Sequence, residues 1–149
     1  MQISMGNTAT MTAADLLKDQ LDDAGHQLTK VMEGMPDKGL DHKITPESMS
    51  PRDQIAHLCE AYEACKVNGA GGKYEWGTYK APTEKSELMS EFDKQRGAAV
   101  NQTLSNATPE AIKLASDYIL GHDYYHVGQL CLARLAVEPD WNFYTIYRE

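Results

Sequence analysis

Apolar residues recur every three or four positions along most of this chain, which is the spacing of one face of an α-helix. The first such stripe consists of Leu17, Leu21, Leu28, Val31 and Met32. Thr12 precedes it with an acidic residue three positions later, a pattern typical of a helix N-terminus. Gly34 and Pro36 follow the stripe and favour a helix end. We therefore predict a first helix over residues 12–34.

Three further helices are marked by their start and stop residues. A hydroxyl cap followed by proline occurs at Ser50–Pro51 and again at Thr108–Pro109. The first of these helices is predicted over residues 50–68, ahead of a glycine-rich stretch, and the second over residues 108–137, ahead of a proline. Between them a helix is predicted over residues 83–106, starting at a Thr-Glu pair.

Four helices of this length predict an all-α fold, with a four-helix bundle as the expected architecture. The connection from Gly69 to Pro82 is longer than the roughly 2–8 residues that join neighbouring helices of a bundle. We therefore expect a long crossover between helices two and three, which would then run in the same direction. Tyr74, Trp76 and Tyr79 alternate within this connection, as in a short strand, a lid or a segment packed against a bundle end.

The length of the chain indicates the number of domains, and the composition of its two end segments indicates which of them packs on the bundle. A chain of 149 residues corresponds to a single domain, residues 1–149. No helical pattern begins before Thr12, so residues 1–11 are expected to be flexible. Residues 138–149 are rich in aromatic side chains, and we expect them to pack on the bundle or on the partner of a dimer.

Charge and cysteine usage restrict the partners and the location. The net charge of −8 argues against binding to nucleic acid phosphates. No apolar run approaches the 18 or so residues of a membrane span, so no span is expected. Residues 1–10 have neither a basic region nor an apolar stretch, so we also expect no signal peptide. The three cysteines form neither a C-x-x-C motif nor a disulfide framework, which favours a reducing, cytoplasmic setting.

Two histidines on the fourth predicted helix suggest a metal site. His122 and His126 are four residues apart, so both imidazoles lie on one helix face and can reach the same point. They continue an apolar stripe that includes Ile112, Ala115, Ile119, Leu130, Ala133 and Val137. Polar rings in the wall of a bundle are costly unless each finds a partner, and a shared divalent metal would satisfy both.

His57, on the second predicted helix, is the best candidate for a third ligand. It lies at the border of the apolar face, and nearby alanines leave room for neighbours. The alternative is that His122 and His126 are satisfied core residues and bind no metal, because H-x-x-x-H also occurs by chance. His26 and His42 are interpreted as solvated or capping residues.

Three further residues are candidates for catalytic roles near this site. Tyr118 lies one turn before His122, Gln129 is three residues past His126, and Glu60 is three residues past His57 and a possible base. Each also has a plain structural interpretation: Tyr118 as core, Gln129 as an interhelical hydrogen-bonding residue and Glu60 as a solvated residue. Cys59 and Cys131 are interpreted as core fillers.

Residues 121–130, Gly-His-Asp-Tyr-Tyr-His-Val-Gly-Gln-Leu, resemble the fourth helix of the DinB-like (YfiT-like) metal-binding four-helix bundles. That family pairs an H-x-x-x-H-x-G-Q stretch with a histidine early in the second helix, where this chain has His57. The resemblance implies a site of His57, His122 and His126 that holds zinc or nickel, the crossover topology, and a homodimer.

The resemblance also implies a class of chemistry. Related proteins are thiol S-transferases that use low-molecular-weight thiols, a thiol-dependent isomerase, and metal-dependent hydrolases. Three neutral ligands leave a metal position open, where a thiol or a water molecule can be deprotonated. We therefore expect a metal-dependent thiol S-transferase that acts on a small molecule. The alternatives are a metal-dependent hydrolase and a metal-binding dimeric bundle without turnover.

Overall fold

The computed structural model describes residues 10–149, and every regular element within that range is a helix. The long elements are α2 (Ala13–Met32), α4 (Pro51–Gly69), α5 (Lys85–Ser105) and a continuous rod of α6 (Pro109–Ala115), η1 (Ser116–Gly121) and α7 (His122–Val137). Two short ones are α3 (Asp37–Leu40) and the 3₁₀ turn η2 (Phe143–Ile146). The all-α class is confirmed. The expected flexibility of residues 1–9 lies outside the described residues.

The predicted caps start the helices. Thr12 forms a full capping box with Asp15, and the side chains of Ser50 and Thr108 each accept a hydrogen bond from a backbone N–H three residues on. The third start differs by one residue from the prediction, because the carboxylate of Glu84 is the cap and accepts from the N–H of Glu87. Negative charge suits this position at the positive end of the helix dipole.

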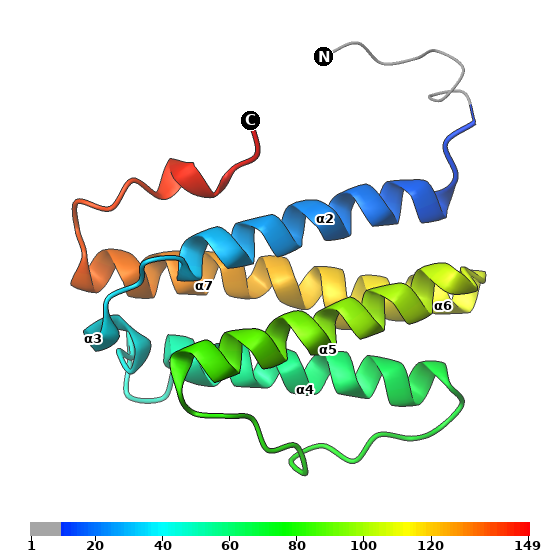
Figure 1. The fold of residues 1–149 in the computed structure, drawn as a ribbon, viewed down its shortest axis with the longest axis horizontal. Helices are drawn as coiled ribbons and strands as arrows, with labels where there is room; N and C mark the ends of the chain where they lie inside the picture. The colour runs from blue at the N-terminus through cyan, green and yellow to red at the C-terminus, as the bar shows by residue number, and fades with distance from the viewer. Residues whose placement is uncertain (1–9) are drawn as a thin grey trace.

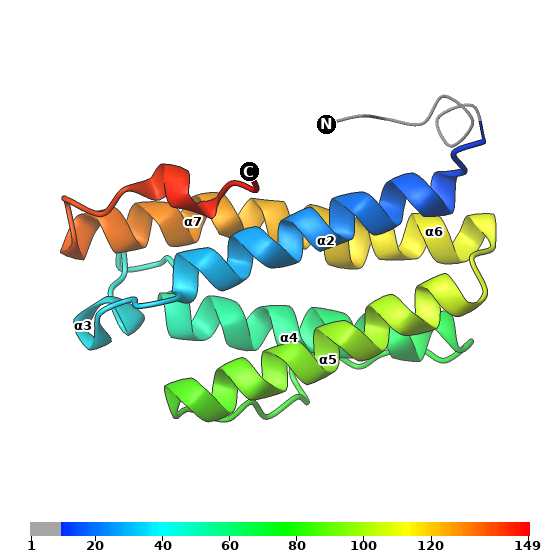
Figure 2. The ribbon, with the colours of Figure 1, turned by 45° about the horizontal axis from the view of Figure 1, so that its top comes forward.

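The long helices pack lengthwise beside one another (Figure 1). α2 packs against α7, and α4 packs against α5. Figure 2 shows α2 lying beside the α6–α7 rod, with α4 and α5 below. In Figure 1, α4 and α5 both run from left to right, and residues 70–84 return along the molecule to connect them. This segment forms no strand.

The core contains cysteines as well as large apolar side chains. Tyr62 of α4 and Phe92 of α5 are almost fully buried and meet edge to face, with ring centroids 5.8 Å apart. Cys59 and Cys65 are buried, and burial raises the pKa of the Cys59 thiol to about 12 and that of Cys65 to about 11. Both thiols are therefore protonated core fillers at neutral pH, as predicted for Cys59.

A buried ion pair and its hydrogen bonds join four helices close to the histidine pair. Asp123 of α7 is 0% exposed, and its Oδ2 accepts from Nε and Nη2 of Arg96 on α5, at 3.0 and 2.8 Å. Tyr62 donates to its other oxygen. Arg96 also donates to the carbonyl of Leu21 on α2 at 2.6 Å. Burial raises the pKa of Asp123, whereas Arg96 and Tyr62 act in the opposite direction.

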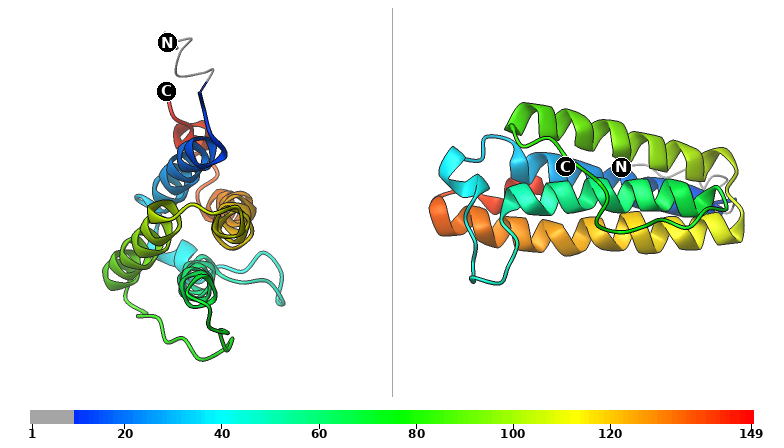
Figure 3. Two further views of the ribbon diagram at one scale, coloured as in Figure 1. Left: turned by 90° about the vertical axis from the view of Figure 1, so that its right-hand side faces the viewer. Right: turned by 90° about the horizontal axis from the view of Figure 1, so that it is seen from below.

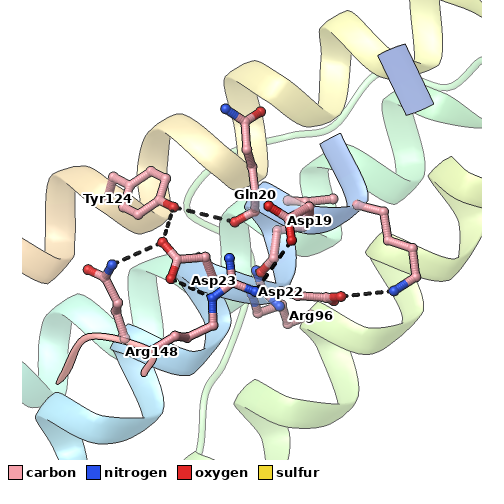
Figure 4. A network of polar contacts seen from close by, with 10 residues as sticks. Asp19, Gln20, Asp22, Asp23, Arg96, Tyr124 and Arg148 are labelled. Atoms are coloured by element: carbon pink, nitrogen blue, oxygen red, sulfur yellow. Dashed lines mark hydrogen bonds and ion pairs between the residues drawn. The ribbon is translucent and has the colours of Figure 1, made fainter. Parts of the chain in front are cut away.

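The C-terminal segment packs on its own chain. Ile146 is buried, and η2 contacts α2. The guanidinium of Arg134 lies 4.4 Å from the ring centroid of Trp141. Figure 4 shows Asp23 of α2 at the centre of the polar contacts here: it accepts from Nε of Arg148 at 2.9 Å and from the hydroxyl of Tyr124 at 2.6 Å. Residues 138–149 were predicted to pack on the bundle or on the partner of a dimer, and the structure shows contacts with the bundle.

Candidate metal centre

The structure brings His57, His122 and His126 together from two helices. The ring centroid of His57 lies 5.5 Å from that of His122 and 5.6 Å from that of His126. The rings of His122 and His126 are 6.3 Å apart and nearly parallel, with an interplanar angle of 15°. The i, i+4 spacing on α7 and the position of His57 early in α4 produce this arrangement.

All three histidines line one cavity with a volume of about 790 Å³. Gln129 and Tyr125 of α7 also contribute to its wall. On another side the wall is formed by residues of the segment before α4, which projects from the helices in Figure 3: Thr45, Glu47, Ser48 and Met49. A cavity of this size is within the range of small-molecule sites, roughly 300–1,000 Å³.

Gln54 determines which nitrogen of His126 is free. Its Oε1 lies 2.8 Å from Nδ1 of His126, and its own Nε2 donates to the carbonyl of Met49 at 3.3 Å. The amide orientation is thereby set, because only the NH₂ group can donate to a carbonyl. Nδ1 of His126 must then carry the proton, which leaves the lone pair on Nε2. Both side chains are buried, with residue exposures of 2% and 3%.

His122 is oriented in the same way by the backbone. Its Nδ1 lies 3.0 Å from the carbonyl oxygen of Tyr118, one turn earlier. A carbonyl only accepts, so Nδ1 is the donor and Nε2 keeps its lone pair. A hydrogen bond from the second ring nitrogen is the usual way in which proteins orient a metal-ligating histidine.

Burial disfavours the charged form of two of these imidazoles, His57 and His126. It lowers the pKa of His126 to about 4, with the nearby His57 and His122 adding to the effect. The pKa of His57 is also lowered, first by burial and then by His122, while Glu60 opposes the shift. Neutral imidazoles have the lone pair that metal binding requires.

The π-helical turn η1 (Ser116–Gly121) sets the register of His122. A π turn contains one residue more than an α turn, so it rotates the following residues around the helix axis. After Ile119 the fully buried position falls on Asp123 and not on His122. The prediction that both histidines occupy the core face is therefore correct for His126 and wrong for His122, which is half-buried and lines the cavity.

Two of the three candidate catalytic residues contact segment 70–84 and do not line the cavity. Oε2 of Glu60 accepts from the hydroxyl of Tyr74 at 2.9 Å and from the backbone N–H groups of Gly77 and Tyr79 at 3.0 and 3.2 Å. Tyr118 stacks on Trp76 with centroids 6.2 Å apart. Gln129 does line the cavity.

Trp76 connects segment 70–84 to the histidines. Its ring centroid is 6.1 Å from that of His57 and 6.2 Å from that of Tyr118. It is 45% exposed. The aromatic alternation in the sequence therefore corresponds to packing beside the histidine cluster. His26 and His42 are half-buried and do not line the cavity.

Three imidazoles are a donor set that zinc uses in proteins, but these rings stand farther apart than the ligands of one ion. Imidazoles that share a zinc ion at about 2.0–2.1 Å have ring centres roughly 5 Å apart. The observed separations of 5.5, 5.6 and 6.3 Å exceed this value. No group of three His, Cys, Asp or Glu within residues 10–149 is arranged to hold a metal ion as it stands. Sharing one ion would require His122 and His126 to approach each other by about 1 Å.

No protein-family model, curated protein or solved structure matches this chain. Within residues 10–149, none of the helices combines the length and apolar character that a bilayer crossing requires. The functional argument therefore depends on the side chains around the cavity.

Proposed function

We propose that His57, His122 and His126 bind one divalent metal, zinc or nickel, and that the protein is a metal-dependent enzyme acting on small molecules. One observation carries this proposal: three imidazoles from two helices converge on a cavity of about 790 Å³. The hydrogen bonds made by Nδ1 of His122 and of His126 support it, because they leave the Nε2 lone pair of each ring free for a metal. A purely structural role for the histidines would not require the cavity.

The ligand set favours catalysis over a structural role. An ion held by three neutral imidazoles keeps its full charge and an open position, and it supplies Lewis acidity that lowers the pKa of a bound thiol or water. Gln54 holds the ring of His126, and the Tyr118 carbonyl holds that of His122. Gln129, in the cavity wall, is available to hydrogen-bond a substrate.

The reaction that we propose is thiol S-transfer. A low-molecular-weight thiol loses its proton to solvent water, its sulfur forms a bond to an electrophilic carbon, and the leaving group departs from that carbon with the bonding electron pair. This choice rests on the resemblance of residues 121–130 and His57 to the DinB-like bundles. The parallel run of α4 and α5 is consistent with that family's crossover topology. The homodimer implied by the resemblance belongs to the same proposal.

The test uses cobalt-substituted protein with 2-mercaptoethanol as thiol and 1-chloro-2,4-dinitrobenzene as electrophile. We expect the thiol to add a sulfur-to-cobalt charge-transfer band, and the two reagents to give the thioether faster than without protein. The His122→Ala variant should show neither effect. A metal-loaded wild type without a thiol band or thioether product would contradict S-transfer. Hydrolysis of a simple ester by that same protein would instead identify a hydrolase.

A further inference from the structure

The charged side chains in the wall of the histidine cavity all have the same sign. Glu47 comes from the segment before α4, and Asp117 comes from the π-helical turn η1. No lysine or arginine within residues 10–149 lines this cavity. The remaining polar groups of the wall, on Thr45, Ser48, Tyr125 and Gln129, are uncharged at neutral pH.

Both carboxylates are available to a ligand. Neither Glu47 nor Asp117 takes part in an ion pair or side-chain hydrogen bond among the described residues, and both are exposed. Other acidic residues nearby are already engaged, as Glu60 is by segment 70–84 and Asp123 is by Arg96. The two carboxylates therefore contribute uncompensated negative charge to the cavity.

The negative charge of the cavity wall determines which substrate charge the cavity favours. A carboxylate or phosphate on the substrate would find no basic partner and would be repelled by Glu47 and Asp117. A cationic group would be attracted to both, and the exposed ring of Tyr125 offers it a cation–π surface. The net charge of −8 adds a field of the same sign.

We infer that the thiol substrate of this cavity carries a positive charge, such as an ammonium group, at the end remote from its sulfur. The sulfur lies at the histidines and the ammonium group lies between Glu47 and Asp117. This inference rests on the proposed metal-dependent thiol chemistry and specifies its substrate class. It excludes anionic thiols as the preferred substrates.

The test compares three thiols of similar size: thiocholine, 2-mercaptoethanol and 2-mercaptoethanesulfonate, which are cationic, neutral and anionic. Their dissociation constants are measured from the charge-transfer band of cobalt-substituted protein. The trimethylammonium and sulfonate groups are poor metal ligands, and a comparison of wild type with a variant of the wall separates the effect of the wall from the different acidities of the three thiols. We expect thiocholine to bind about tenfold more tightly than the sulfonate, which corresponds to about 1.4 kcal/mol.

The double variant Glu47→Gln/Asp117→Asn should lose most of that preference while its affinity for neutral 2-mercaptoethanol stays within about twofold. A matched control, Asp140→Asn, removes a carboxylate outside the cavity and should keep the preference. Equal binding of all three thiols by the wild type, or an unchanged preference in the double variant, would overturn the inference alone. Failure of every thiol to bind metal-loaded protein would overturn the proposed function and this inference with it.

Discussion

At the scale of single residues, the site depends on hydrogen bonds that fix imidazole orientation. Gln54 and His126 form a buried pair that connects α4 to α7 beside the cavity. If its partner were removed, Nδ1–H of His126 would remain buried without an acceptor. That group would then favour another ring orientation or tautomer, and Nε2 would no longer be presented to a metal.

We therefore predict that Gln54→Leu weakens zinc binding about 10- to 100-fold, the usual cost of losing such a hydrogen bond. Gln54→Glu keeps an acceptor and should retain affinity. Competition with a chromophoric chelator measures both. The matched control is Gln27→Leu, which removes a buried glutamine bonded to Asp23 and far from the cavity wall. Zinc affinity of Gln54→Leu within about twofold of wild type would refute the positioning role.

The lowered pKa of His126 predicts a pH-dependent stability of the metal-free protein. Its pKa is about 4 in the folded state and 6.5 ordinarily, so the unfolded chain binds more protons between these values. The contribution to stability is present above about pH 6.5 and is lost as the pH falls toward 4, with a magnitude on the order of 3 kcal/mol. Urea unfolding at several pH values should show a flatter profile for His126→Gln. Identical profiles would contradict this assignment.

Many residues of the site could be predicted from the sequence. The remaining ones could not, because their roles depend on contacts between elements. Histidine spacing on one helix identifies His122 and His126, because periodicity reports which side chains share a face. Gln54 was missed as an orienting residue, because a glutamine three residues before His57 carries no signal of the helix that it will face. The roles of Glu60 and Tyr118 depend on segment 70–84, whose path no periodicity describes.

At the scale of elements, Glu60 links α4 to segment 70–84. One carboxylate oxygen receives three of the hydrogen bonds that hold this irregular segment beside the histidine cluster. Buried or partly buried hydrogen bonds to a charged acceptor are stronger than neutral ones. The segment also carries Trp76, so the position of the aromatic ring next to His57 depends on this anchor.

Glu60→Ala should therefore release segment 70–84, with faster amide hydrogen exchange around residues 74–79 and a loss of roughly 2 kcal/mol of unfolding free energy. Glu63→Ala is the matched control, because Glu63 forms a partly exposed ion pair with Lys66 one turn away, at 2.8 Å. Unchanged exchange in Glu60→Ala, together with lost turnover, would contradict the anchor and favour Glu60 as a base.

Helix starts and stops were predictable because caps act locally. Ser50, Thr12 and Thr108 each satisfy N–H groups within three residues, so no tertiary contact is needed to recognise them. The π-helical turn was not predictable, because no cap or periodicity in the sequence marks the place where one extra residue enters a helical turn. As a consequence of this turn, the residues after it are rotated around the helix axis, so that Asp123 and not His122 takes the buried position.

At the scale of the whole molecule, the ion pair of Arg96 and Asp123 connects α2, α5 and α7. We predict that Arg96→Met costs about 3–5 kcal/mol of unfolding free energy, because it leaves Asp123 charged and buried without its partner. Arg148→Met is the control: Arg148 pairs with Asp19 and Asp23 at 41% exposure and should cost less than about 1 kcal/mol. Equal losses in urea denaturation would contradict this distinction.

This ion pair marks the limit of prediction from sequence at the molecular scale. The all-α class follows from helical periodicity and caps. A charged residue in an amphipathic helix looks like a solvated position, however, and only the assembled packing shows that Arg96 and Asp123 are withdrawn from water.

The central claim is that the three histidines hold a metal, and elemental analysis tests it most directly. Untagged wild type, His122→Ala and His26→Ala would be purified and reconstituted with zinc or nickel in parallel. We predict about one equivalent of metal in the wild type and in His26→Ala, whose histidine lies outside the cavity wall, and almost none in His122→Ala. No metal in reconstituted wild type, or equal metal in all three proteins, would contradict the claim.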